Sequence, residues 1–177
     1  MRFTVTPDWR DNHLLKLVLA WFLVYVALFW VTNGLLYFAK MGLTPQSVVA
    51  YYRGDEERFL QPRSYQGMLE IAHFHLFAMG ILVLTMTHLL LFVPMSTRSK
   101  AWIVSLSFAS AVGDEAAGWL VRFVAPGFAY LKIASFVTLQ ATLGFMVAAV
   151  TWALLTAQRN AYRDSADDPD DLEDDDG

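Results

Sequence analysis

The chain has no cysteine among its 177 residues. This absence excludes disulfides, iron–sulfur clusters, thiolate zinc sites and covalent attachment of a c-type haem. Charge is also scarce, because charged residues make up 17% of the sequence, against roughly 25% in an average soluble domain. Hydrophobic residues make up 56%. The composition is that of a membrane protein, and the length allows one domain.

The acidic residues are concentrated at the C-terminal end. Nine of the 17 acids lie within residues 164–177, a segment with too little apolar content to fold. We expect a disordered acidic tail that solubilises the chain or docks a basic partner. No basic cluster is interleaved with aromatic residues, so the sequence gives no indication of nucleic-acid binding.

Four apolar runs each reach the length of about 20 residues that a helix needs to cross a bilayer. They are residues 14–38, 68–94, 101–124 and 130–157. Short links after the second and third runs predict an all-α membrane protein, an up-down four-helix bundle over residues 14–163. The run that follows residues 1–13 is too long for a cleavable signal peptide, so we expect an uncleaved anchor.

The longest connection, residues 39–67, contains a short helix by its capping pattern. Thr44 suits the N-cap position and Pro45 the first helical position. The segment from Gln46 to Tyr52 is therefore predicted to be an amphipathic helix at the membrane interface. The basic residues Arg98 and Lys100 between the second and third runs favour a bacterial inner-membrane protein with both termini in the cytoplasm.

The strongly polar residues of the spans lie at one depth. At about 1.5 Å per residue they sit roughly 8–15 Å below the outer surface. They are Asn33, His73, His75, Asp114, Glu115 and Gln140. Polar groups inside a membrane are costly and usually face a protein interior, so we expect one buried polar site between the helices.

Helical angles divide the second span into two faces. At 100° per residue, Glu70, His73 and His88 share one face. His75 points almost the opposite way, on a face with three methionines, namely Met68, Met79 and Met86. One ion is therefore not easily bound by both His73 and His75 from a regular helix.

On the third span, Asp114 lies in line with a strip of small residues that suits close helix contact. This strip contains Ser107, Ser110 and Gly118. Glu115 and Arg122 are two turns apart on one side of the helix, so we expect them to pair. That pairing leaves Asp114 for the polar site.

Three chemistries fit these residues. The Glu-x-x-His spacing of Glu70 and His73 is the one by which bundle helices supply metal ligands, and Asp114 and His75 could complete a transition-metal site. Dinuclear sites use two such motifs, and this chain has one. In the structural alternative, Glu70 is satisfied by the helix N-terminus.

A b-type haem is the second chemistry. His73, His75 and His88 are the candidate haem ligands, but His73 and His88 are about 22 Å apart along one helix. Each could ligate a separate haem, with Met or nothing as the other axial ligand. Histidines near each end of one span resemble the architecture of membrane cytochromes b.

The third chemistry is proton or ion conduction, because buried acids and histidines at one depth form relays. Asn33, Glu115, Arg122 and Gln140 would support the site. The alternative without a cofactor is a hydrogen-bonded network that fixes helix packing and a subunit interface. The pattern assigns no substrate and no enzymatic reaction.

Three short motifs resemble those of small bacterial four-span membrane proteins. They are Tyr51-Tyr52-Arg53-Gly54, His73-Phe74-His75 and Pro126-Gly127-Phe128. The resemblance covers most of residues 45–157 and implies a common fold. Taken together, the sequence predicts a membrane subunit that binds b-type haem or a metal ion for electron transfer in a redox or respiratory assembly. The alternative is a structural or proton-handling subunit, and other membrane subunits or a second copy are the expected partners.

Overall fold

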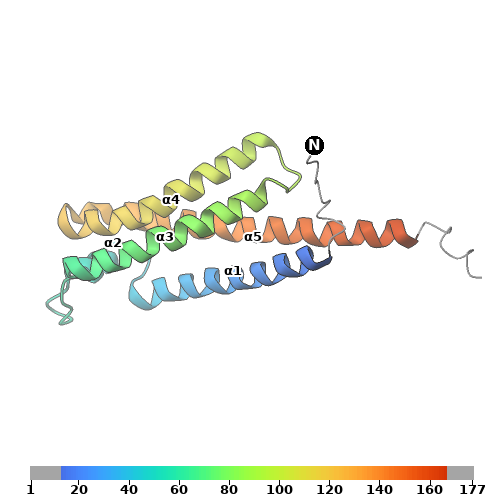
Figure 1. Ribbon diagram of the computed structural model, residues 1–177. Coiled ribbons are helices and arrows are strands. Elements are labelled where there is room, and N and C mark those ends of the chain that lie inside the picture. Colours follow the sequence, from blue (N-terminus) through green and yellow to red (C-terminus); the bar gives the residue numbers. More distant parts are fainter. Residues whose placement is uncertain (1–12, 167–177) are drawn as a thin grey trace, which may run out of the picture.

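The computed structural model describes residues 13–166, and every regular element in that range is a helix (Figure 1). The helices are α1 (His13–Lys40), α2 (Pro45–Arg53), α3 (Tyr65–Leu90), α4 (Thr97–Phe123), the 3₁₀ helix η1 (Pro126–Phe128) and α5 (Ala129–Ala166). This result confirms the predicted all-α class. The predicted acidic tail, residues 164–177, lies almost entirely outside the described residues.

The four long helices lie side by side and alternate in direction (Figure 1). The beginning of α1, the α3–α4 connection and the end of α5 lie at one end of the bundle. We call this the connector end. The short α2 and η1 lie at the other end, which we call the loop end.

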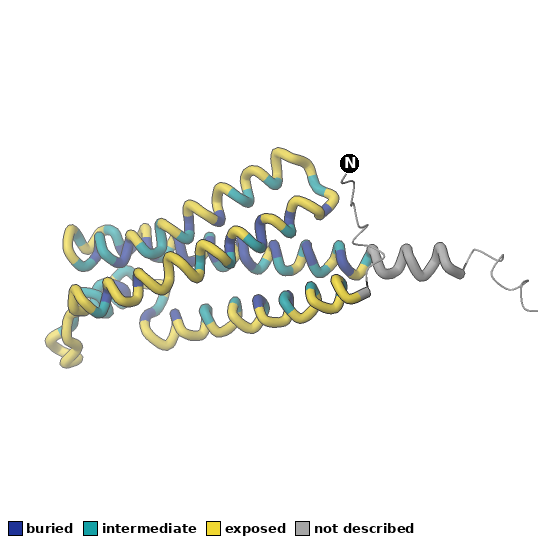
Figure 2. Tube along the Cα trace, in the orientation of Figure 1, coloured by how far each residue is buried: buried dark blue, intermediate teal, exposed yellow. Residues whose placement is uncertain are grey.

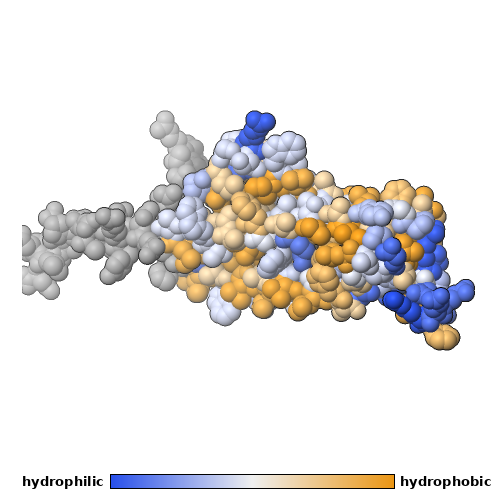
Figure 3. Space-filling model, turned by 180° about the vertical axis from the view of Figure 1, so that it is seen from behind, coloured by the Kyte–Doolittle hydropathy of each residue, from blue (hydrophilic) through white to orange (hydrophobic). Residues whose placement is uncertain are grey.

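Within the described range, three helical segments are long and apolar enough to cross a membrane: Leu14–Lys40, Tyr65–Leu90 and Pro126–Thr156. The remaining long helix, α4, is more polar because its apolar sequence contains Asp114 and Glu115. It packs mainly against α5. Figure 3 shows apolar side chains over the body of the bundle and hydrophilic side chains gathered at the loop end.

Local signals explain where the helices begin. Ser64 and Ser96 accept hydrogen bonds from the backbone N–H groups of Gly67 and Ser99 and so cap α3 and α4. Both helices therefore begin a few residues before the apolar runs 68–94 and 101–124. Pro45 begins α2, as predicted, but Thr44 makes no side-chain cap hydrogen bond.

The core is divided into two clusters along the bundle. The larger cluster joins α1, α3 and α5 and includes Val26, Met86 and Leu143. The smaller cluster lies at the loop end, where Tyr37 stacks on Phe136 with ring centroids 3.6 Å apart. Figure 2 shows that buried positions follow the lines where helices face each other, while the outer faces are exposed.

Candidate functional site

A buried ion pair joins α4 and α5 near the loop end. Nζ of Lys132 lies 2.8 Å from Oδ2 of Asp114 and also donates to the backbone carbonyl of Asp114 at 2.9 Å. The side chains are 8% and 23% exposed. Removing two charges from water is costly, and good geometry with additional hydrogen bonds is what offsets that cost.

The other oxygen of Asp114 lacks such a partner. Within the described part of the chain, Oδ1 is buried and accepts no hydrogen bond. A buried acceptor left unsatisfied costs about 1–3 kcal/mol, and more when it is charged. A water molecule or a proton at Oδ1 would remove that cost.

The neighbouring residue, Glu115, meets a histidine from α3. Nδ1 of His75 lies 3.4 Å from Oε2 of Glu115. The Glu115 side chain is 18% exposed and that of His75 is 54% exposed. The distance is longer than the roughly 2.6–3.2 Å of a direct transfer, so the carboxylate and the imidazole can exchange a proton through one water molecule.

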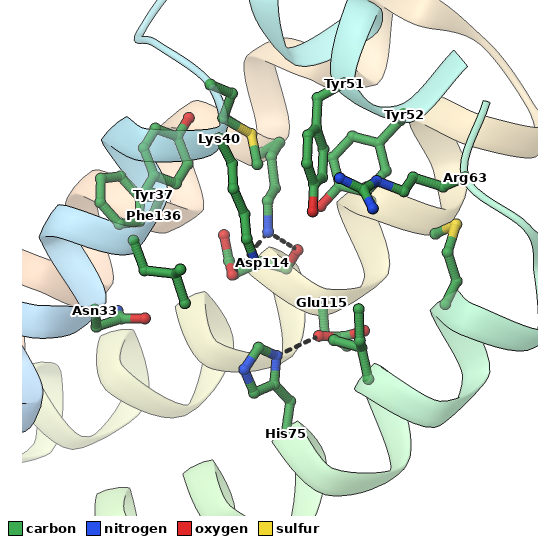
Figure 4. Close-up of a pocket in the computed structure, with 16 residues that line it drawn as sticks. Asn33, Tyr37, Lys40, Tyr51, Tyr52, Arg63, His75, Asp114, Glu115 and Phe136 are labelled. Atoms are coloured by element: carbon green, nitrogen blue, oxygen red, sulfur yellow. Dashed lines mark hydrogen bonds and ion pairs between the residues drawn. The ribbon is translucent and has the colours of Figure 1, made fainter. Parts of the chain in front are cut away.

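These groups line a pocket of about 100 Å³ near the loop end. Figure 4 shows Asp114 and Glu115 reaching into the pocket from α4, with His75 approaching from α3 and Tyr51 and Tyr52 from α2. Three cationic residues also line it, namely Lys40, Arg63 and Lys132. A polar cavity of this size has room for a few water molecules.

A second pocket, of about 80 Å³, lies against the same polar residues. Four residues line both pockets: Asn33, His75, Asp114 and Glu115. The remainder of the second lining is mostly apolar and includes Met79, Val83, Phe108 and Leu139. The polar residues therefore stand at the boundary between the two cavities.

The short helix α2 covers the first pocket because it can approach α4 closely at Gly118. A Cβ atom at this position would lie 2.8 Å from the hydroxyl oxygen of Tyr52. Arg53 fixes the same helix by donating from Nε to the carbonyl of Val121 at 2.9 Å. The predicted small-residue strip of α4 is buried, with Ser107, Ser110 and Gly118 all in the interior.

The Tyr52 phenol stays protonated in this position. Burial raises its pKa above the ordinary value, and the negative charge of Asp114 adds to the rise. Its ring also lies 6.0 Å from Nζ of Lys132. Tyr52 therefore contributes a neutral hydroxyl group to the side of the pocket that α2 covers.

A hydrogen-bonded network ties α1 to α5 beside the two pockets. Trp30 donates from Nε1 to the backbone carbonyl of Gln140 at 2.9 Å. The Gln140 amide accepts from Asn33 and donates to the Trp30 carbonyl, each at 3.4 Å. Asn33 and Gln140, which were predicted to lie at one depth, thus form a hydrogen bond between α1 and α5.

The structure does not bring His73 and Glu70 to these pockets. Both side chains are exposed, Glu70 accepts from Gln66 at 3.0 Å, and the His73 ring packs edge-on against Phe74. The reason is that the opposite side of α3 packs inward, with Ala72 and Met86 buried. Among the described residues, no three histidine or carboxylate groups gather as they would around a metal ion, so the expected set of Glu70, His73, His75 and Asp114 is not assembled.

The predicted Glu115–Arg122 pair does not form either. Arg122 donates from Nε to the backbone carbonyl of Arg63 at 2.9 Å, while Glu115 meets His75. The segment before α3 returns close to the end of α4, so Arg122 finds a backbone acceptor there. Arg122 therefore fixes the loop and not the polar site.

Sequence reasoning missed Lys132 as a site residue. The signal was the hairpin of α4 and α5, whose turn lies near residue 125. Helices joined by a short turn pack antiparallel, so residues a few turns before and after it can face each other, as Asp114 and Lys132 do. Gly113 and Ser135 face each other across the same two helices, since a Cβ at Gly113 would lie 2.7 Å from Oγ of Ser135.

The third histidine of α3, His88, lines a different cavity towards the connector end. This pocket has a volume of about 580 Å³ and lies between α1, α3 and α5. Its lining is mainly apolar, with His88, Lys16 and Thr85 as the polar contributions. The volume falls within the range of roughly 300–1,000 Å³ that small-molecule sites occupy.

Comparison with known proteins identifies the membrane domain. A family model described as a transmembrane helical domain, Aq_1264_TM, matches residues 42–161. The match begins just after α1 and extends through α2, α3 and α4 into α5. No curated protein and no solved structure matches the chain.

Proposed function

The chain belongs to the Aq_1264_TM family of transmembrane helical domains, and on this premise we propose that it is a proton-handling subunit of a membrane assembly. Its proposed setting is a bacterial inner membrane, with α1, α3, α4 and α5 all crossing the bilayer. Arg98 and Lys100 belong to the first turn of α4, which lies at the connector end with the beginning of α1 and the end of α5. A short connector with two basic residues is typical of the cytoplasmic side, so the proposed orientation places the connector end in the cytoplasm.

The observation that carries the proposal is the boundary between the two pockets. Four polar residues line both cavities, and two of them, His75 and Glu115, are 3.4 Å apart. A proton that enters from the loop end would meet Glu115 and His75 before it reaches the apolar second pocket. Acids and histidines in this arrangement are typical of membrane proton relays.

The Lys132–Asp114 pair places two opposite charges beside the groups that exchange the proton. The ammonium group of Lys132 is held by two oxygens of Asp114, which leaves Oδ1 as an unsatisfied acceptor in the interior. In a medium of low dielectric constant, charges interact more strongly than in water. Lys132 therefore stabilises the negative charge of Asp114, while Glu115 and His75 remain available to exchange a proton.

Proton flux into vesicles tests the proposal. The purified protein in liposomes that contain a pH-sensitive dye should admit protons faster than protein-free liposomes when a pH gradient is imposed. We expect Glu115→Gln to slow the flux about a hundredfold, the low end of what a positioned acid–base group contributes. Glu57→Gln is the matched control, because Glu57 is exposed in the loop before α3. Flux equal to that of empty liposomes, or unchanged in Glu115→Gln, would overturn the proposal.

A redox subunit is the second candidate, and the large pocket at His88 is the observation that favours it. We propose that this pocket is where a b-type haem would bind, with the His88 imidazole from its lining as an axial ligand. An optical spectrum and metal analysis of the purified protein test this candidate. A Soret band that is lost in His88→Ala supports it, and a colourless, metal-free protein from cells supplied with haem and metals contradicts it.

A further inference from the structure

The outward face of α3 carries ionisable groups that no other helix within residues 13–166 covers. Five residues spaced by three or four positions form a continuous exposed stripe: Glu70, His73, Phe77, Ile81 and Leu84. At 100° per residue they fall on one side of the helix, opposite the buried residues Ala72, Val83 and Met86. Figure 2 shows this side of α3 as exposed along its length.

Lipid is a poor neighbour for this stripe. The segment Tyr65–Leu90 is one of those long and apolar enough to cross a membrane, and His73 lies roughly 12 Å into it at 1.5 Å per residue. Ionisable groups at such depths almost always face protein or a water-filled cavity. Within the described chain, Glu70 bonds only to Gln66 of its own helix, and the ring contact of His73 is with Phe74.

We propose that this stripe packs against the same stripe of a second copy, with the two α3 helices parallel about a two-fold axis normal to the membrane. Copies with the same membrane orientation can pair only in this parallel sense. In a two-fold interface, residue i contacts residue j of the other copy and j contacts i. Glu70 and His73 are one turn apart, so each Glu70 meets the partner's His73, and two reciprocal contacts form.

Charge complementarity favours a second copy over other occupants. The stripe presents its own acid and its own imidazole at nearly the same depth, and a two-fold axis places each opposite the other. Phe77 and Leu84, 73% and 60% exposed, supply apolar contact along the stripe.

The pairing would also join two Glu-x-x-His motifs. One chain has a single such motif, whereas dinuclear bundle sites use two. The inference is independent of the proposed proton-handling function, because none of the stripe residues lines both pockets at the polar boundary.

Disulfide cross-linking tests this interface cleanly, because the chain has no cysteine. Phe77→Cys and Leu84→Cys are oxidised in native membranes, with Val112→Cys on α4, 59% exposed, as the matched control. The two α3 variants should form covalent dimers about tenfold faster than the control, since the interface raises the effective thiol concentration. Equal rates at all three positions, or no dimers, would overturn the proposal. So would recovery of a different membrane protein on this face without self-cross-linking.

A charge exchange tests the reciprocal contact itself. His73→Glu places like charges opposite each other and should abolish the cross-link at Leu84→Cys. The double exchange Glu70→His with His73→Glu restores opposite partners and should restore the cross-link. Loss in both variants, or cross-linking that persists in His73→Glu, would contradict the Glu70–His73 contact between copies.

Discussion

The ammonium group of Lys132 contacts both the carboxylate and the backbone carbonyl of Asp114, at 2.8 and 2.9 Å. The second contact involves a carbonyl that is part of the α4 backbone. One side chain of α5 thus fixes both the position of the Asp114 carboxylate and the register of the α4–α5 hairpin. This pair forms one wall of the first pocket.

Removal of one partner of this pair should destabilise the bundle. Lys132→Met leaves Asp114 charged and unpaired in the interior, and we expect a loss of about 3 kcal/mol in the free energy of unfolding. Lys132→Met with Asp114→Asn removes both charges and should recover most of that loss. Thermal unfolding in detergent measures both variants. A double variant as unstable as Lys132→Met would show that the charges are not what couples the two helices.

The close contact between α2 and α4 at Gly118 predicts the effect of one added methyl group. Gly118→Ala places a Cβ 2.8 Å from the Tyr52 hydroxyl oxygen, so the Tyr52 ring or α2 must shift and stability should fall by about 1–3 kcal/mol. Gly127→Ala is the control, because a Cβ at Gly127 meets nothing within 4 Å. Equal melting temperatures for the two variants would mean that α2 is not held against α4 as described.

How far the site could be predicted differs between its residues. Helical rise and short connections fixed the depth of Asn33, His75, Asp114 and Glu115, and these four residues do line a common pocket. Depth alone could not place His73, because residues at one depth can still lie on opposite faces of a helix. Angles separated the two faces of α3 correctly but did not decide which face packs inward.

The inward face of α3 is decided by apolar packing. Met68 and Met86 are buried, and their face carries His75, so the methionine-lined side is the interior one. The sequence interpretation gave too much weight to the glutamate and the two histidines on the other face. Lys132 was missed because a lysine near the start of a span usually extends to the lipid headgroups. Here the contact with Asp114 on α4 holds the lysine side chain in the interior.

The buried phenol of Tyr52 predicts a change in stability at high pH. Its pKa is raised in the folded protein by burial and by Asp114, so the folded state keeps a proton that the unfolded state releases above about pH 10. The contribution of the Tyr52 phenol to the free energy of unfolding is therefore fully present below pH 10 and is lost as the pH rises further. The melting temperature should fall less between pH 10 and 11 in Tyr52→Phe than in the wild type. Parallel curves for the two proteins would contradict the burial of this phenol.

Chemical rescue tests the central claim, that His75 and Glu115 pass protons between the two pockets, most directly. His75→Ala removes the imidazole that lies 3.4 Å from Glu115, and its half-exposed position lets a small molecule enter. Proton flux into liposomes should fall in His75→Ala and should recover when imidazole is added to the buffer. Glu115→Gln should show no such recovery. Flux that is unchanged in His75→Ala, or that imidazole raises equally in both variants, would contradict the account.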